Sequence, residues 1–181
     1  NLFHTPQKFL KKNCYVILTI NTLLLGMHIL GFMTRFIAGD ETGLAPSDVL
    51  AEQERIARAD AVAFVFPLFW WGMPAMTKGW IDRVWSWGWA YDQLDDPNKS
   101  LQRPRTGVLL VPAGARSDEM AEAGYDAAIR TAWMGGTFGY FGFSDRSLII
   151  LNGSKGSDAR RANLLARAYA AGQNISPPAL R

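Results

Sequence analysis

Cysteine is almost absent from this 181-residue chain, and so are acidic excess, internal repeats and low-complexity tracts. The single cysteine, Cys14, cannot form an internal disulfide and has no partner at metal-ligand spacing. This fits a reducing compartment or a chain indifferent to redox state. We expect a cytoplasmic protein with no metal site. The formal net charge is +3, but the arginines are scattered through helix-like segments and form no basic block. We therefore expect no nucleic-acid partner.

One uncharged run stands near the amino terminus. No formally charged side chain occurs from Asn13 to Thr34 if His28 is neutral, and Lys11 and Lys12 come just before the run. This pattern resembles a signal or a membrane anchor. Polar residues interrupt it, however, and a buried strand followed by a tight connection would read similarly. We favour the strand and expect no membrane association.

What the chain does contain is an alternation of short apolar runs and amphipathic segments, with 49% apolar residues overall. That content supports one α/β domain over residues 1–181. The apolar runs predict strands at 61–66, 106–111 and 148–151. The amphipathic segments predict helices at 48–59, 75–87, about 118–135 and about 158–171. This order indicates βαβ units, hence a central parallel sheet with helices on both faces.

Two loops should meet at one edge of this sheet, because ligands of open parallel sheets bind where the strands end. The first loop runs from Pro67 to Pro74 and contains three successive large aromatics, Phe69, Trp70 and Trp71. A planar, electron-accepting ring could stack on such a wall while free backbone N–H groups bind its carbonyl edge. The alternative is that the aromatics fill a core or a subunit interface. The second loop, residues 112–117, is built of small residues that allow close approach to the backbone, although ordinary turns look the same.

The stretch from Asp60 to Asp92 closely resembles the signature of the NAD(P)H dehydrogenase (quinone) family. Members typically read FPLWW-G-MPA-LKGWIDRV followed by a G-AY end, and this chain reads FPLFWWGMPAMTKGWIDRVWSWGWAY. The family includes NAD(P)H:quinone oxidoreductases, modulator of drug activity B and potassium-efflux accessory oxidoreductases. Order and spacing agree from about Gly31 to Leu151, whereas the amino-terminal part is divergent or incomplete. The resemblance implies a flavodoxin-like three-layer sandwich that binds FAD or FMN, uses NAD(P)H as co-substrate and forms a homodimer.

The resemblance also implies the cofactor-binding residues. The aromatic loop supplies Pro67, Leu68, Phe69, Trp70, Trp71 and Gly72, whose backbone amides would stabilise negative charge on the reduced ring. Val111, Pro112, Ala113 and Gly114 stand where the family has a Thr-Thr-Gly-Gly loop, and only the last glycine is kept. The lost hydroxyls and the proline remove hydrogen-bond donors to the flavin.

Three further positions carry weaker expectations. The substrate-side tyrosine and histidine of the family map to Glu119 and Tyr125, and neither identity is kept. Tyr125 could donate a hydrogen bond to a quinone oxygen, the alternative being an ordinary tyrosine on a helix face. Glu119 has the corresponding alternative of a solvated helix residue. His4 is a candidate for the phosphate-loop histidine, or else an unremarkable terminal residue.

The resulting hypothesis is a flavin-dependent NAD(P)H:quinone oxidoreductase acting on a quinone-like acceptor. A flavodoxin-like accessory or regulatory subunit with poor turnover is the second hypothesis, favoured by the altered loops. A one-electron flavodoxin ranks third, because such carriers are usually acidic and this chain is not.

Overall fold

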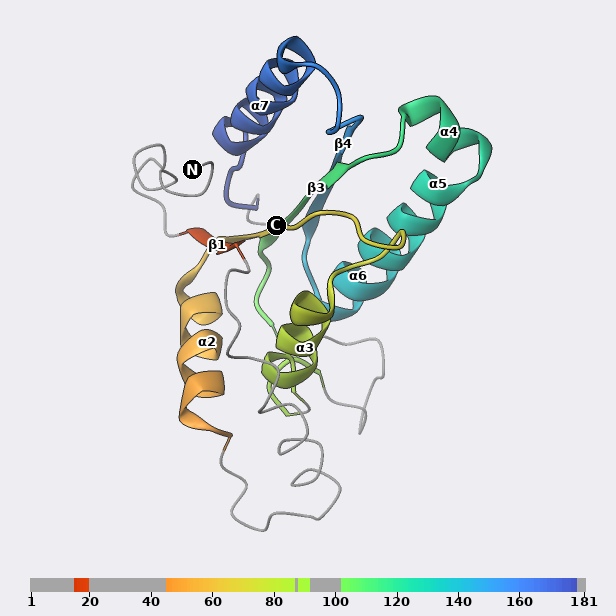
Figure 1. Cartoon of the computed structure of the whole chain (residues 1–181). Helices are drawn as coiled ribbons and strands as arrows, with labels where there is room; N and C mark the ends of the chain where they lie inside the picture. Colours follow the sequence, from red (N-terminus) through yellow and green to blue (C-terminus); the bar gives the residue numbers. More distant parts are fainter. Residues whose placement is uncertain (1–14, 20–44, 87, 92–101, 179–181) are drawn as a thin grey trace.

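The computed structural model describes residues 15–19, 45–86, 88–91 and 102–178 (Figure 1). Within this part of the chain, strands and helices alternate. The strands are β1 (Tyr15–Thr19), β2 (Ala61–Val65), β3 (Thr106–Ala113) and β4 (Asp145–Asn152). The helices are α2 (Ser47–Arg58), α3 (Ala75–Val84), α4 (Ser117–Glu122), α5 (Tyr125–Arg130), the π-helix η1 (Thr131–Thr137), α6 (Phe138–Phe141) and α7 (Asp158–Gln173).

The described strands form one parallel sheet in the order β1-β2-β3-β4. Tyr15 pairs with Ala61, and Ala61 in turn pairs with Thr106, so the carboxyl ends of the strands point to one edge. Strand β1 lies inside the uncharged run, as the favoured interpretation of that run requires; residues 20–34 lie outside the described residues. Among the described residues, no helix is both long and apolar enough to cross a membrane.

Helices cover both faces of the sheet, as the strand and helix alternation predicts (Figure 1). On one face, α7 contributes Leu164, which packs with Leu110 of β3 and Leu151 of β4. The other face packs against α2, α3 and the run from η1 to α6. The predicted three-layer α/β architecture with a parallel sheet is therefore confirmed.

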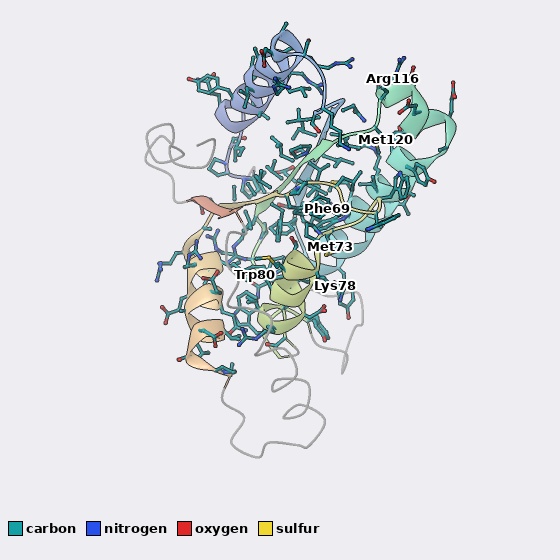
Figure 2. The ribbon with its side chains drawn as sticks, in the orientation of Figure 1. Phe69, Met73, Lys78, Trp80, Arg116 and Met120 are labelled. Carbon is teal, nitrogen blue, oxygen red and sulfur yellow. The ribbon has the colours of Figure 1, made fainter. Side chains whose placement is uncertain are left out.

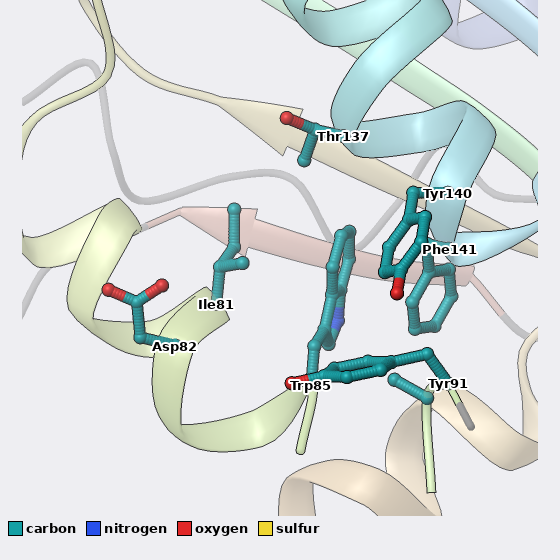
Figure 3. A pocket seen from close by; sticks show the side chains of 8 residues that line it. Ile81, Asp82, Trp85, Tyr91, Thr137, Tyr140 and Phe141 are labelled. Atoms are coloured by element: carbon teal, nitrogen blue, oxygen red, sulfur yellow. The ribbon is translucent and has the colours of Figure 1, made fainter. Parts of the chain in front are cut away.

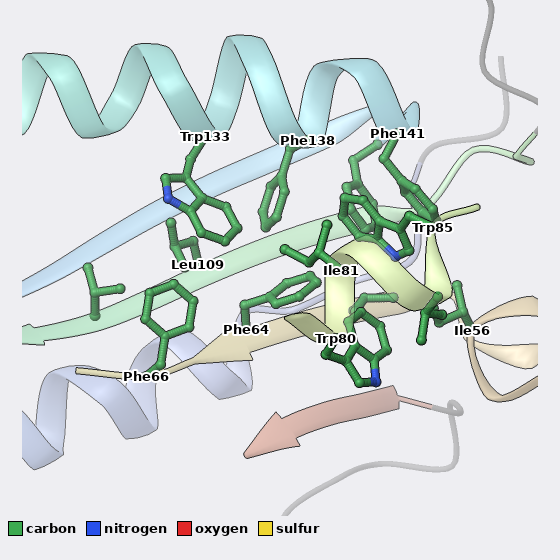
Figure 4. Packing of buried hydrophobic residues seen from close by; sticks show 14 of the residues in the cluster. Ile56, Phe64, Phe66, Trp80, Ile81, Trp85, Leu109, Trp133, Phe138 and Phe141 are labelled. Carbon is green, nitrogen blue, oxygen red and sulfur yellow. The ribbon is translucent and has the colours of Figure 1, made fainter. Parts of the chain in front are cut away.

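An aromatic cluster centred on Phe64 of β2 fills the space between the sheet and the second helix layer (Figure 4). The Phe64 side chain is fully buried, with 0% exposure. Its ring centroid lies 5.9 Å from that of Trp80, 5.8 Å from that of Trp85 and 5.4 Å from that of Phe138. Gly107 of β3 leaves room for this layer, since an added Cβ would stand 2.7 Å from the Phe143 ring.

The expected helix at 75–87 ends earlier than predicted, at Val84, with Trp85 as its C-cap. Trp85 leaves the helical conformation, with φ of −86° and ψ of 64°, and its ring stacks on Phe141 at 4.0 Å. Packing of this indole against α6 replaces the continuation of the helix.

The helical region expected over about 118–135 is present, but it is divided into α4, α5 and η1. Gly124 adopts a left-handed φ of 73° and separates α4 from α5. Further on, η1 widens to a π-helix, in which residues five apart share a face. Trp133 and Phe138 are five apart, and their rings meet edge to face at 5.4 Å in the core. The widened turn thus directs both rings into the same layer.

Strand β3 runs two residues further than the predicted 106–111, so Pro112 and Ala113 belong to the sheet and not to a loop. Pro112 has no N–H, but its carbonyl accepts a hydrogen bond from the Leu68 N–H at 2.9 Å. Pro112 faces the β2 side of β3, and β2 has already ended at Val65. The missing N–H of Pro112 therefore removes no hydrogen bond between β2 and β3.

Candidate functional site

The aromatic loop after β2 folds into a tight two-residue turn. Phe69 and Gly72 exchange two backbone hydrogen bonds, of 3.2 Å from the Phe69 N–H and 2.9 Å from the Gly72 N–H. The two residues between them, Trp70 and Trp71, have φ of 49° and 58°. Turns of this kind usually place Asn or Gly at these positions, because a left-handed residue with a side chain costs about 1–2 kcal/mol. Strain of this size is retained where the conformation serves a function.

The aromatic side chains of this turn face solvent. Trp70 is 91% exposed, Phe69 57% and Trp71 46%. They therefore do not fill the core of this chain, whereas the alternative that they fill a subunit interface stays a prediction. A tryptophan left open to water is a large apolar surface available for a flat ligand or a partner.

The second predicted segment lies directly beside this turn. The Leu68 N–H bonds to the Pro112 carbonyl, and the N–H groups of Gly153 and Ser154 bond at 2.9 Å to the carbonyls of Ala115 and Ala113. Figure 2 labels Phe69 on the aromatic loop and Arg116 where the chain enters α4. The ends of β2, β3 and β4 thus form one continuous edge, as the parallel sheet predicts.

Not every backbone donor assigned to the flavin remains available. The Leu68 and Phe69 amides are already bonded within the protein, to Pro112 and Gly72. Within the described residues, the amides of Trp70, Trp71 and Gly114 donate to no protein acceptor. These three amides are therefore the donors that a ligand at this edge could use.

Tyr125 meets the aromatic loop, although the two are far apart in the sequence. Its ring lies 4.6 Å from the Trp71 ring, with an angle of 32° between the planes. Trp71 in turn lies 6.3 Å from Trp70. An offset aromatic pair of this geometry contributes about 0.5–1.5 kcal/mol beyond its buried area. Sequence reasoning placed Tyr125 near the site but missed its contact with Trp71, which no spacing signal reveals.

Glu119 performs a local structural task. Its carboxylate accepts a hydrogen bond of 2.9 Å from the Arg116 N–H and so caps the start of α4. Its substrate-side role stays a prediction, as does that of His4, which lies outside the described residues and precedes β1.

Arg116 and Asp118 form an exposed ion pair beside Gly114, with 2.5 Å between guanidinium and carboxylate. The hydrogen bond from Arg116, together with the backbone bond from Glu119, lowers the pKa of Asp118 to about 2. The same pair raises the pKa of Arg116 above its ordinary value. Both groups stay charged at neutral pH, so the Asp118 carboxylate is neutralised by Arg116 at this end of the edge.

Cavities formed by described residues also lie elsewhere, and the following two contain no sequence-predicted site residue. One, of about 340 Å³, opens between the end of α3 and α6 (Figure 3) and is lined by Ile81, Asp82, Trp85, Ala90, Tyr91, Thr137, Tyr140 and Phe141. The other, of about 380 Å³, lies where β3 and β4 begin and α7 ends. Among the described residues, no cluster of His, Cys, Asp or Glu could hold a metal ion.

Comparison with known proteins identifies the class to which this fold and edge belong. Residues 7–175 match the family described as flavodoxin-like fold. The chain therefore belongs to the flavodoxin-like fold family, as the signature at 60–92 implies. A solved NAD(P)H:quinone oxidoreductase from Methanothermobacter marburgensis is 34% identical with a TM-score of 0.67, and the match covers 78% of this chain and 72% of that one.

Curated relatives agree over shorter stretches. An uncharacterized NAD(P)H oxidoreductase of Haemophilus influenzae is 32% identical over 103 residues, or 57% of this chain and 51% of the relative. NAD(P)H dehydrogenase [quinone] 1 of Rattus norvegicus is 49% identical over 82 residues, or 45% of this chain and 30% of the relative. The chain thus spans about half the length of these curated relatives, or less.

Proposed function

We propose that this chain is a flavin-dependent NAD(P)H:quinone oxidoreductase. The observation that carries the proposal is the strained Trp70–Trp71 turn, which holds an exposed indole and free amides at the carboxyl edge of a flavodoxin-like sheet. The similarity to a solved NAD(P)H:quinone oxidoreductase supports the same activity.

The residues present at the edge fit a flavin. The Trp70 indole, 91% exposed, offers a flat apolar surface to an isoalloxazine ring. The unbonded amides of Trp70 and Trp71 match the hydrogen-bond acceptors along the pyrimidine end of such a ring. Gly114 has no side chain to block the approach, since a Cβ there would meet only the flexible Lys155 side chain, at 3.3 Å. The choice between FAD and FMN stays open.

When bound, the flavin would take a hydride from NAD(P)H and pass two electrons to a quinone-like acceptor, the second proton coming from solvent. The protein contributes orientation and charge stabilisation. The Trp70 and Trp71 amides are fixed before the reaction by the Phe69–Gly72 hydrogen bonds, so they stabilise developing negative charge without reorganising. NAD(P)H and acceptor occupy the same site in turn.

Tyr125 is positioned to serve the acceptor. Its ring rests on Trp71, and its hydroxyl has no bonded partner among the described residues. As the acceptor oxygen gains negative charge, this hydroxyl donates a hydrogen bond to it. Removing this hydroxyl alone, as in Tyr125→Phe, is therefore expected to lower turnover more than cofactor affinity.

Reconstitution tests the proposal directly. The purified chain is mixed with FMN and, separately, with FAD, freed of excess cofactor, and assayed with NADH and NADPH against a soluble quinone. We expect retained flavin absorbance and NAD(P)H-dependent quinone reduction with at least one cofactor. Protein that stays colourless and inactive with both would contradict the proposal.

A second candidate is a flavodoxin-like accessory subunit that binds flavin and turns over poorly. Val111 and Pro112 favour it, because they replace the two threonine hydroxyls of the family's loop and Pro112 also lacks an N–H donor. Restoring threonine at position 112 separates the two candidates. A large gain in turnover with Pro112→Thr supports the accessory role for the natural sequence, whereas brisk turnover without it supports the enzyme.

The homodimer implied by the family resemblance is part of this proposal. Light scattering during gel filtration measures the oligomeric state. Twice the chain mass of 20.1 kDa is expected, and the mass of a single chain would contradict it.

A further inference from the structure

The Trp70–Trp71 turn has a conformation that its own sequence does not favour. Both residues are left-handed, at φ of 49° and 58°, and neither is glycine or asparagine. The Phe69–Gly72 hydrogen bonds close the turn, and the bond from Leu68 to Pro112 fixes its base. None of these bonds involves the side chains at the tip, whose contacts are with other aromatic rings.

Tyr125 contacts the tip. The centroid of its ring lies 4.6 Å from that of Trp71, with 32° between the planes, so it meets the turn at one of the two left-handed residues. Tyr125 is itself firmly placed, because it is the first residue of α5 and follows the left-handed Gly124, and α5 is anchored in the core by Ile129, which is 5% exposed. A rigid helix thus presents an aromatic ring to a strained loop.

We propose that Tyr125 is a positioning residue whose ring holds the left-handed Trp70–Trp71 turn by packing against Trp71. The clamp keeps the Trp70 indole and the two free amides in one arrangement. The consequence for flavin affinity rests on the proposed function, but the clamp itself is a property of the free protein. The ring performs this task, and the hydroxyl is left to the acceptor.

The contact predicts a measurable conformational penalty when it is lost. If the turn without its clamp spends only about a tenth of the time in the binding conformation, the apparent dissociation constant for flavin rises about tenfold. Tyr125→Phe keeps the ring and should retain wild-type affinity. Tyr125→Leu removes the ring while leaving an apolar side chain of moderate size.

The experiment combines three variants and three measurements. Tyr125→Phe and Tyr125→Leu are compared with the control Tyr169→Leu, which changes another half-exposed tyrosine on α7. Chymotryptic cleavage after Phe69, Trp70 or Trp71 is timed by mass spectrometry in the free protein, and the near-ultraviolet circular dichroism of the coupled rings is recorded. Dissociation constants for FMN and FAD are then measured by fluorescence quenching.

We expect Tyr125→Leu to be cleaved faster in the turn, to lose ring dichroism and to bind flavin about tenfold more weakly, while Tyr125→Phe and Tyr169→Leu match the wild type. Tyr125→Leu with unchanged cleavage and dichroism would overturn the clamp. So would Tyr125→Phe behaving like Tyr125→Leu, since the hydroxyl would then be responsible.

Two controls keep the outcome interpretable. If Tyr125→Leu lowers the unfolding temperature, Trp71→Leu and the double variant replace it: a clamp requires that the second substitution add little to the first, and full additivity would refute it. If wild-type protein binds no flavin, the proposed function fails, while cleavage and dichroism still decide whether the clamp exists.

Discussion

Two sets of aromatic residues occupy opposite situations in this molecule. Around Phe64 the rings are buried, and those of Trp80 and Trp85 meet the Phe64 ring edge to face. At the carboxyl edge of the sheet, Trp70 and Trp71 are exposed, and their backbone is strained. The same residue types therefore serve different ends. The inner set stabilises the fold, whereas the outer set lowers stability through backbone strain and exposes an apolar surface.

The largest expected effect is on the inner set. Phe64→Ala removes a fully buried ring that contacts Trp80, Trp85, Trp133 and Phe138. Loss of transfer free energy and the remaining cavity should lower the free energy of unfolding by about 4 kcal/mol. Urea denaturation followed by tryptophan fluorescence measures the change. If Phe64→Ala lowered the free energy of unfolding no more than Trp70→Ala does, the contrast between the inner and outer aromatic sets would be wrong.

An intermediate loss of stability is expected at Gly107, which packs closely against the inner aromatic rings. Gly107→Ala places a Cβ 2.7 Å from Phe143 and 2.9 Å from Phe138, so the aromatic layer must shift. We expect a loss of about 1–3 kcal/mol in denaturant unfolding. The matched control is Gly135→Ala, whose Cβ would have nothing within 4 Å. Equal stability of the two variants would contradict tight packing around Phe143.

The smallest effect concerns an ion pair that belongs to neither set. Arg83 is buried and pairs with the half-exposed Asp48 at 2.7 Å. Burial raises the pKa of Asp48, but the hydrogen bond and charge of Arg83 outweigh it, so the pKa lies below the ordinary value of 3.8. The folded state thus binds the Asp48 proton more weakly than the unfolded state. The pair's contribution is complete above about pH 4 and is lost as pH falls through the lowered pKa.

Asp48→Asn should therefore lower the free energy of unfolding at neutral pH by about 1 kcal/mol or less, because Asp48 is largely exposed. It should also flatten the acid limb of a stability–pH profile measured by thermal unfolding. Glu54→Gln, which removes an exposed pair with Arg58, serves as the control and should change little. An unchanged acid limb in Asp48→Asn would show that this pair does not contribute to the pH dependence.

The sheet and the loop that follows β2 could be predicted from the sequence because their signals are local. The run at 61–66 is apolar on both faces, and Pro67 and Pro74 bound the loop that follows it. The left-handed turn could not be predicted, since Phe-Trp-Trp-Gly lacks the Asn-Gly or Gly-Gly pair that normally marks one. The break at Gly124 does have a sequence signal, because a glycine stands inside the helical pattern. Good helix formers on both sides of Gly124 make that signal weak.

The contacts between distant residues were beyond prediction for another reason. Tyr125 reaches Trp71 only because the β3–α4–α5 path returns over the edge of the sheet, and no spacing in the sequence encodes that path. Likewise, the family resemblance implies that the Leu68 and Phe69 amides are flavin donors. These amides are bonded to Pro112 and Gly72, whereas those of Trp70, Trp71 and Gly114 are not bonded within the described residues.

The central claim is that the outer aromatic set binds a flavin and does little for stability. Trp70→Ala tests it when flavin titration and thermal unfolding are performed on the same preparation. We predict that affinity for FMN or FAD falls about tenfold or more, as for loss of one stacking platform, while the Tm of the flavin-free protein stays within about 2 °C of the wild type. Unchanged affinity, or a large drop in Tm, would contradict the claim.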